Sequence, residues 1–228
     1  TAYPGERSNT ESHKQVLKDL GFNAIAPVEI LDENGSVKLE VPRGKHIKEN
    51  YVGAGFSDYN SFLVLSHFKG HAMAGFGGAI KNMSIGIASV EGKMWIHTAG
   101  LTKDVDDFKL CFETEQNRFL ESMAEASLSI ESALSGNIIY INLMNNLSVD
   151  CDCDNDPAPP EMSDIGILAS LDPVALDKAC VDLIYEADKE RSASLRQRFE
   201  ERNGKHVLDY AESIGLGSKA YDLVLLDD

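Results

Sequence analysis

Three short apolar runs constrain the fold of this chain most. They span Phe62–Leu65, Ile138–Leu143 and Ile165–Ala169, and each has the length and composition of a buried strand. A longer segment between the first two, from Thr114 to Leu134, places its apolar residues on one face of a helix. Strands that alternate with helices predict an α/β fold with a mostly parallel sheet and helices on both faces.

The remaining segments complete this prediction. Asn9 or Thr10 is expected to begin a helix that ends before Gly21. Two strands, Ala24–Leu31 and Val37–Val41, are expected to form a β-hairpin around the turn at Asp32–Gly35. Three further helices are expected, from Asp172 and Pro173 to about Tyr185, near 189–202 and over 205–214, and a strand or tail over 222–226. We expect one α/β domain over 1–228, with an N-terminal part of a larger protein missing.

The amino-acid composition argues against some classes of function. The 228 residues carry a net charge of −16, which argues against binding to nucleic acid or to an anionic membrane. A small anionic substrate stays compatible, because a local group of Lys and His can oppose the overall charge. The sequence shows no secretory signal, and its four cysteines (Cys111, Cys151, Cys153 and Cys180) do not suggest a disulfide scaffold. We therefore expect a cytoplasmic protein.

The segment Ser66–Asn82 follows the first apolar run and is the strongest candidate for a functional site. It gathers two His, two Lys and several Gly where a strand ends, and ligands of α/β proteins bind at that end. His71 and Lys81 are the candidate catalytic residues, and His67 is a candidate metal ligand. The candidate cofactor-binding residues are Gly75, Gly77, Gly78 and Asn82. The alternative is a tight glycine turn in which one His satisfies a buried hydrogen bond.

The second candidate is the acidic loop 150–156. Cys151, Asp152 and Cys153 could hold a transition-metal ion, since two thiols one residue apart can contact the same soft metal. An acidic surface loop with incidental thiols explains the pattern equally well. The loop departs from a calcium-binding loop, because Asn155 stands at the glycine position.

Other polar residues have simpler interpretations. Asp164, Asp172 and Asp177 form a third candidate set, although Asp172 is most simply expected to cap a helix. His97 is either part of the site or structural. The basic loop Pro42–His46 is expected to be solvated surface, as are His13 and His206.

The central segment resembles the domain family DUF362. The resemblance rests on Ser66–His71, Gly75–Gly78 with Lys81 and Asn82, Tyr3–Asn9, Cys151–Cys153 and Ser163–Asp177. Members of that family often carry an inserted ferredoxin module and are associated with iron–sulfur proteins. This chain has no series of Cys-x-x-Cys motifs, so no ferredoxin-type cluster is expected in it. Members also usually have another βα portion before the Tyr-Pro-Gly segment.

A shorter motif is similar to the nickel-pincer lactate racemase family. It consists of His71, Gly75, Phe76 and Gly78, with Lys81 ten residues after His71. That resemblance implies proton transfer by the His and a Lys that carries a modified nicotinic cofactor. A shared fold with a different ligand would give the same motif.

Two functions remain open from the sequence. The first is a metal- or cofactor-dependent enzyme that acts on a small anionic molecule. The second is a non-catalytic metal-binding or redox-accessory module, which would work with a redox protein partner or as a homo-oligomer. Both require the glycine-rich segment and the acidic loop to meet at one pocket mouth.

Overall fold

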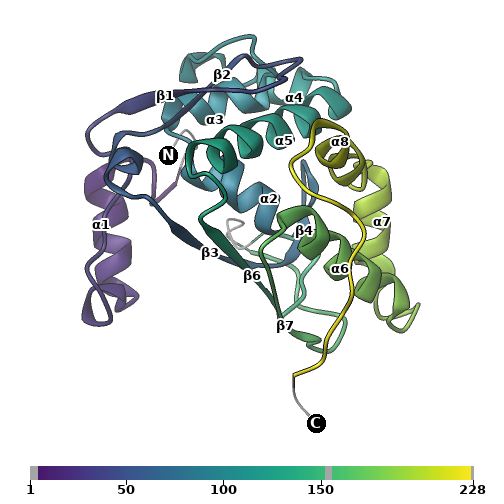
Figure 1. The fold of residues 1–228 in the computed structure, drawn as a ribbon. Helices are drawn as coiled ribbons and strands as arrows, with labels where there is room; N and C mark the ends of the chain where they lie inside the picture. Colours follow the sequence, from purple (N-terminus) through teal and green to yellow (C-terminus); the bar gives the residue numbers. More distant parts are fainter. Residues whose placement is uncertain (1–4, 152–155, 227–228) are drawn as a thin grey trace.

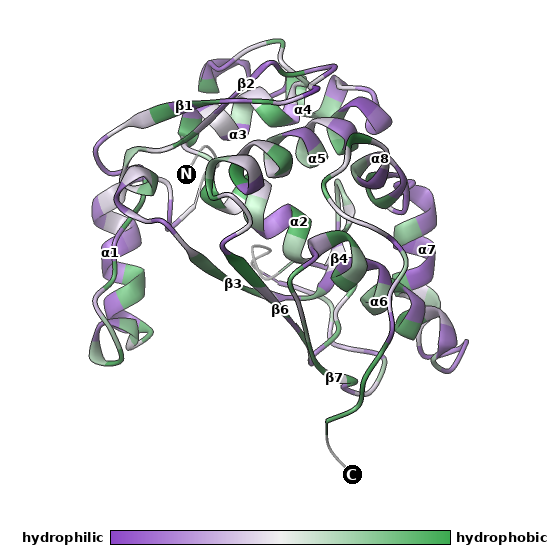
Figure 2. Ribbon diagram, viewed as in Figure 1, coloured by the Kyte–Doolittle hydropathy of each residue, from purple (hydrophilic) through white to green (hydrophobic). Residues whose placement is uncertain are grey.

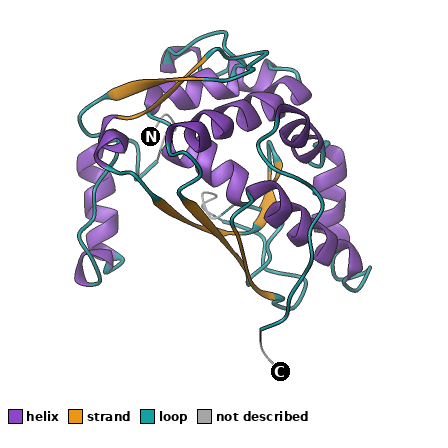
Figure 3. Cartoon of the chain, viewed as in Figure 1, coloured by secondary structure: helices purple, strands orange, loops and turns teal. Residues whose placement is uncertain are grey.

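The computed structural model describes residues 5–151 and 156–226, and Figure 1 shows their arrangement. The α-helices are α1 (Thr10–Asp19), α2 (Ala79–Lys81), α3 (Val90–His97), α4 (Leu110–Glu113), α5 (Gln116–Ala133), α6 (Pro173–Glu186), α7 (Ala193–Glu201) and α8 (His206–Ile214). The strands are β1 (Ser36–Glu40), β2 (Glu49–Gly53), β3 (Phe62–His67), β4 (Lys69–His71), β5 (Gly75–Gly77), β6 (Ile138–Met144) and β7 (Gly166–Ser170). Short 3₁₀ turns lie at η1 (Phe22–Ala24), η2 (Ala54–Asp58) and η4 (Val105–Asp107), and a π-turn lies at η3 (Asn82–Gly86). More of the described residues lie in helices than in strands, and Figure 3 shows the helices in purple and the strands in orange.

The three predicted strands form one sheet with the order β3-β6-β7. β3 and β6 are parallel, whereas β7 runs antiparallel to β6. The α/β prediction therefore holds in its coarse form, but the sheet is small and mixed rather than mostly parallel. The physical reason lies in the connection from β6 to β7, whose described residues form no helix. A parallel pair needs a crossover, usually helical, and an antiparallel pair does not.

The two faces of this sheet differ sharply. One face is buried under α2 and α6 and carries Val64, Tyr140 and Met144. The opposite face exposes Leu63 and Ile167, and Figure 2 shows β3 and β6 in the green of apolar residues. The prediction of helices on both faces is therefore wrong for the part of the chain that the structure describes.

The N-terminal hairpin forms from different strands than predicted. β1 pairs with β2, and the basic loop Pro42–His46 lies in the connection between them. Ala24–Leu31 is not a strand: it begins in η1, and Ile25 is 83% exposed. Its alternating pattern has no core to face, and Pro27 lacks the N–H that a strand would donate.

Helix ends follow the local rules. Asn9 caps α1 by accepting a hydrogen bond from the backbone N–H of Ser12, and Gly21 follows the helix with φ +79°. Asp172 caps α6 in the same way through Val174 and Ala175. The predicted helix over Thr114–Leu134 is α5. The apolar run Ile85–Ser89 forms no named strand: Ile85 and Gly86 belong to η3, and Ala88 makes only an isolated bridge with Val52.

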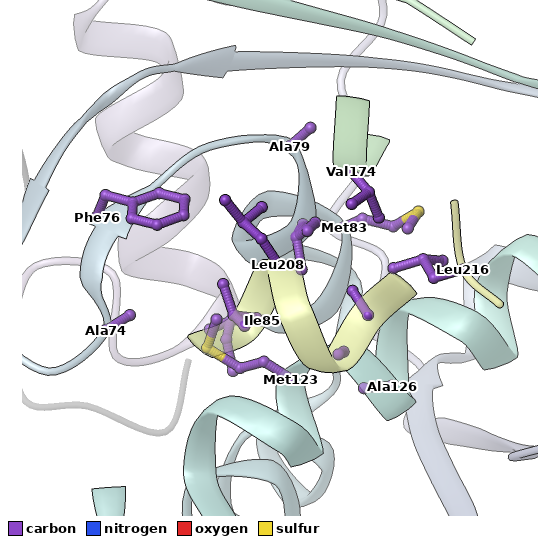
Figure 4. Close-up of a cluster of buried hydrophobic side chains, with 14 of the residues drawn as sticks. Ala74, Phe76, Ala79, Met83, Ile85, Met123, Ala126, Val174, Leu208 and Leu216 are labelled. Atoms are coloured by element: carbon purple, nitrogen blue, oxygen red, sulfur yellow. The ribbon is translucent and has the colours of Figure 1, made fainter. Parts of the chain in front are cut away.

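The core lies where α2 and η3 pack between α5, α6 and α8. Figure 4 shows Met83, Met123 and Leu208 from three of these elements in one cluster. Cys111 and Cys180 are buried, as expected of small apolar side chains. Among the described residues, no helix is both long enough and apolar enough to cross a membrane.

Candidate functional site

The segment Ser66–Asn82 packs against residues 145–149, just before the acidic loop 150–156, and we call this junction the mouth. The N–H of Gly70 donates to the carbonyl of Ser148 at 2.9 Å, and His67 Nε2 lies 2.5 Å from the carbonyl oxygen of Asn145. A Cβ at position 70 would lie 2.2 Å from the carbonyl oxygen of Val149, so only glycine fits this contact. Cys151 ends the described part of this segment and is partly exposed. Asp152 and Cys153 lie outside the described residues.

The ring of His67 is engaged on both sides. Nε2 donates to the Asn145 carbonyl, and Nδ1 lies 3.2 Å from Nζ of Lys69, which can donate to it. The ring would have to give up one of these contacts to bind a metal ion. Among residues 5–151 and 156–226, no group of three or more His, Cys, Asp or Glu is placed to hold a metal.

The geometry of His71 defines the protonation state of its ring. Its Nδ1 accepts hydrogen bonds from the backbone N–H groups of Met73 (3.1 Å) and Ala74 (3.0 Å). A nitrogen that accepts two hydrogen bonds carries no proton, so the neutral ring holds its proton on Nε2. Burial, together with nearby cations, lowers the pKa of His71 well below its usual value. His71 is thus a neutral hydrogen-bond donor at Nε2.

The cations that act on His71 come from three elements. Lys81 ends α2, Lys69 begins β4, and Arg198 lies on α7. Arg198 also donates to the carbonyl oxygen of Val149 at 3.1 Å and lies 3.4 Å from Asp150. Lys81 and Lys69 add positive charge near His71 in a chain whose net charge is −16, while Arg198 shares its charge with Asp150.

The carboxylate of Asp177 binds the N-terminal end of α2. Its carboxylate is fully buried and accepts from the N–H groups of Ala79 (2.7 Å) and Ile80 (3.0 Å) and from the amide of Asn142 (2.8 Å). Burial raises the pKa of Asp177 to about 6, although these hydrogen bonds oppose the shift. Asp177 therefore positions the helix that ends in Lys81, and it lies under Gly78 rather than in the mouth.

The remaining candidates of the central segment have structural contacts. The Asn82 amide donates to the Leu65 carbonyl and to the Ser66 hydroxyl, which ties η3 to β3. Gly75 has φ +81°, and a Cβ at Gly78 would lie 2.3 Å from Asp177 Oδ1. A Cβ at Gly77 would meet only the flexible side chain of Lys81, at 3.3 Å. Packing alone therefore accounts for Gly75 and Gly78.

His97 lies behind the mouth rather than in it. Its side chain is buried and stacks on Phe119 with ring centroids 4.9 Å apart. Nδ1 donates to the Lys93 carbonyl at 2.7 Å, and burial lowers the pKa of His97 to about 4. His97 is close enough to lower the pKa of His71 as well.

A second polar cluster was not predicted. Glu125 is fully buried on α5 and accepts from the backbone N–H groups of residues 45–47 and from the Tyr210 hydroxyl. Glu121, one turn earlier, lies 2.5 Å from Nε2 of His46 and 2.9 Å from Nε2 of His206. Burial opposes the charge of Glu121, but hydrogen bonds from these His and from Lys45 outweigh it and lower the pKa to about 2.

This cluster corrects the prediction that His46 is solvated surface, because its side chain is only 8% exposed, whereas Pro42, Arg43 and Lys45 of the basic loop are exposed as predicted. The His206 side chain, at 26%, is likewise partly buried against Glu121 rather than a simple surface residue. The available signal was two Glu four residues apart on the face of α5 opposite the predicted apolar stripe.

A surface hollow of about 460 Å³ lies away from this site, at the start of β3. Phe56, Tyr59 and Leu134 are among its lining residues, which include no Asp, Glu, His, Lys or Cys. The hollow therefore offers little acid–base chemistry.

Comparison with known proteins gives one match. The family model described as "Domain of unknown function (DUF362)" matches residues 2–182. No curated protein and no solved structure matches the chain.

Proposed function

Since the chain belongs to the DUF362 family, whose function is unknown, we propose its function from the geometry of the mouth between residues 67–82 and 148–151. The proposal is an enzyme that acts on a small anionic molecule, with Lys81 and Arg198 attracting the anion and His71 donating a hydrogen bond to it. One observation carries it: a neutral imidazole, locked as a donor at Nε2, lies among three cations in an acidic protein.

This arrangement suits the stabilisation of negative charge on an oxygen atom. A fixed N–H donor beside lysine and arginine lowers the energy of an oxyanion or enolate more than that of a neutral carbonyl. His71 does not suit proton abstraction in this state, because its unprotonated nitrogen is already occupied by two backbone N–H groups. His71 therefore acts as donor and Lys81 as the counter-charge.

A transition-metal ion is part of the proposal only at Cys151. A thiol at the mouth, followed in sequence by Asp152 and Cys153, is a donor set that soft metal ions prefer. A metal there would supply Lewis acidity. The buried thiols Cys111 and Cys180 fit a reducing compartment, and we propose a cytoplasmic setting for this reason.

Anion binding tests the proposal directly. Thermal unfolding is measured with a panel of small carboxylates, phosphate and sulfate, since a ligand that binds only the folded state raises the melting temperature. We expect one class of anion to raise it in the wild-type protein. Lys81→Met should abolish that rise, whereas Lys18→Met, at an exposed position on α1, should leave it unchanged. Equal loss in both variants, or no response to any anion, would refute the proposal.

Two variants of His71 separate its roles. In His71→Asn, the side-chain oxygen lies near the position of Nδ1 and can keep the hydrogen bonds from Met73 and Ala74, but no group lies at the position of Nε2. Gln places an amide near Nε2 and loses the Nδ1 acceptor. We expect His71→Asn to fold normally and to lose affinity for the anion about tenfold, the worth of one charge-assisted hydrogen bond. Unchanged affinity in His71→Asn would exclude His71 as the donor.

The alternative function is a non-catalytic metal-binding or redox-accessory module. The partial exposure of Cys151 favours it, because reactive thiols are accessible ones. Metal analysis of protein purified without added metal, together with the pH dependence of Cys151 alkylation, distinguishes the two. A stoichiometric metal or a thiol reactive below neutral pH, without any anion response, supports the accessory module.

A further inference from the structure

The sheet β3-β6-β7 exposes an ordered apolar face. Strand register lines up its outward side chains in rows, in which Leu63 lies beside Ile139, and Leu143 lies opposite Ile167. The apolar side chains of this bare face are Leu63, Leu65, Ile139, Ile141, Leu143, Ile167 and Ala169. Leu63 is 61% exposed and Ile167 is 72% exposed. Leu65 and Ile139 are 58% and 49% exposed, whereas Ile141 and Leu143 are partly buried.

Such a face is unusual for a strand pair that is parallel, because parallel sheets are normally covered on both sides. Burying a Leu or Ile side chain stabilises by roughly 1.5–3 kcal/mol. At about 25 cal/mol per Å², this corresponds to roughly 60–120 Å² of apolar surface for each side chain. The bare face therefore exposes on the order of 300 Å² of apolar area.

A second apolar surface is also largely exposed. It belongs to residues 10–25, which comprise α1 and η1 and which we call the N-terminal unit. No residue of α1 is buried, and Leu20, Phe22 and Ile25 are 68%, 50% and 83% exposed. An amphipathic helix is stable when its apolar stripe packs on another element. Figure 1 shows α1 standing away from the sheet, beyond β3.

We propose that two copies of this chain form a two-fold dimer in which the N-terminal unit of each copy packs on the bare face of the other. A two-fold interface is reciprocal, so one arrangement covers both kinds of surface in both copies. The bare face and the N-terminal unit together expose on the order of 500 Å², and two copies bury about 1,000 Å². That area is near the lower end for specific interfaces, about 1,200 Å², so the dimer is weak and concentration-dependent.

Charge adds a second expectation. Each copy carries a net charge of −16, so the two copies repel each other at low ionic strength. Salt screens this repulsion and leaves the apolar contact intact. The dimer should therefore tighten as salt is added, whereas a dimer held by ion pairs would weaken.

Sedimentation equilibrium of the full chain, over a wide range of protein and salt concentrations, tests the proposal. The wild-type protein should show a monomer–dimer equilibrium that shifts toward dimer with salt. Ile167→Lys and Leu20→Glu should each raise the dissociation constant at least tenfold. Both positions are mostly exposed, so the fold should tolerate the substitutions, and circular dichroism checks this. Leu225→Glu, at an 83% exposed position of the C-terminal tail, is the matched control and should change nothing.

Mixing the two variants tests the reciprocal pairing. In a mixture, the intact N-terminal unit of Ile167→Lys can pack on the intact bare face of Leu20→Glu, and the second pairing sets Lys against Glu. The mixed dimer should therefore be tighter than either variant alone. A wild-type protein that stays monomeric overturns the proposal. So does a dimer that is insensitive to both substitutions, or a mixture that gains nothing.

Discussion

Asp177 should give the stability of this protein an unusual dependence on pH. Its buried carboxylate has a pKa of about 6 in the folded protein, because burial penalises its charged form, against an ordinary value of 3.8. Between pH 4 and pH 6 the folded state keeps the proton that the unfolded chain releases. The free energy of unfolding therefore falls as the pH rises through this window. The difference between the two pKa values corresponds to about 3 kcal/mol.

The variant Asp177→Asn isolates this effect, because it has no proton to lose. All other groups titrate in both proteins, so the difference in unfolding free energy reports on Asp177 alone. We expect that difference to move by about 2 kcal/mol in favour of the variant between pH 4 and about pH 6.5, and to be nearly flat above it. Urea unfolding, followed by the fluorescence of the single tryptophan, Trp95, measures both proteins at each pH.

A difference that stays constant from pH 4 to pH 7 would refute this reasoning. The reasoning can also be tested without the variant, should Asp177→Asn fail to fold. Carbon-13 spectra of the wild-type carboxyl groups should then show one aspartate that titrates near pH 6. If every aspartate titrates near pH 4, the hydrogen bonds from α2 outweigh burial and the assignment of a raised pKa is wrong.

Three smaller changes have equally definite outcomes. The pKa of Glu121 is about 2, below its ordinary 4.5, so its carboxylate stabilises the fold above pH 4.5 and this contribution is lost as the pH falls toward 2. In urea titrations at acid pH, the wild-type protein should therefore lose about 3 kcal/mol of unfolding free energy relative to Glu121→Gln. Glu125→Ala should cost roughly 3–5 kcal/mol, seen as a lower urea midpoint, because it leaves several buried donors without an acceptor; a loss under about 1 kcal/mol would mean that water replaces the carboxylate. Gly70→Ala should lower the free energy of unfolding by roughly 1–3 kcal/mol and weaken anion binding, because its Cβ would collide with Val149. Gly77→Ala should lower it by less than about 1 kcal/mol, and similar losses of stability in the two variants would contradict the close contact at Gly70.

Local chemistry made part of the fold predictable. Asn9, Gly21 and Asp172 mark helix ends through hydrogen bonds within a few residues, and these ends lie close to where they were expected. The three apolar runs became strands of one sheet for the same reason. Their directions were not predictable, because the orientation of β7 depends on a connection with no helical signal.

Burial patterns were harder to anticipate. The apolar run of β3 predicted a strand that is covered on both sides, yet Leu63 and Leu65 face outward. Composition reports how apolar a strand is but not which neighbours the rest of the molecule provides. The opposite error occurred in the basic loop, where His46 is buried because Glu121 and Glu125, far away in sequence, supply the hydrogen bonds.

The geometry around His71 shows how the chemistry of a candidate residue can differ from expectation. Sequence placed His71 at the mouth, where a histidine is commonly expected to act as a base. The tight turn after β4 then aims the N–H groups of Met73 and Ala74 at Nδ1, a detail of backbone geometry that no residue type encodes. The turn holds the ring neutral, and the adjacent Lys81 further disfavours a second proton. A substrate for such a site must therefore offer an acceptor oxygen, and the enzyme proposed here works by stabilising charge on that oxygen rather than by removing a proton with His71.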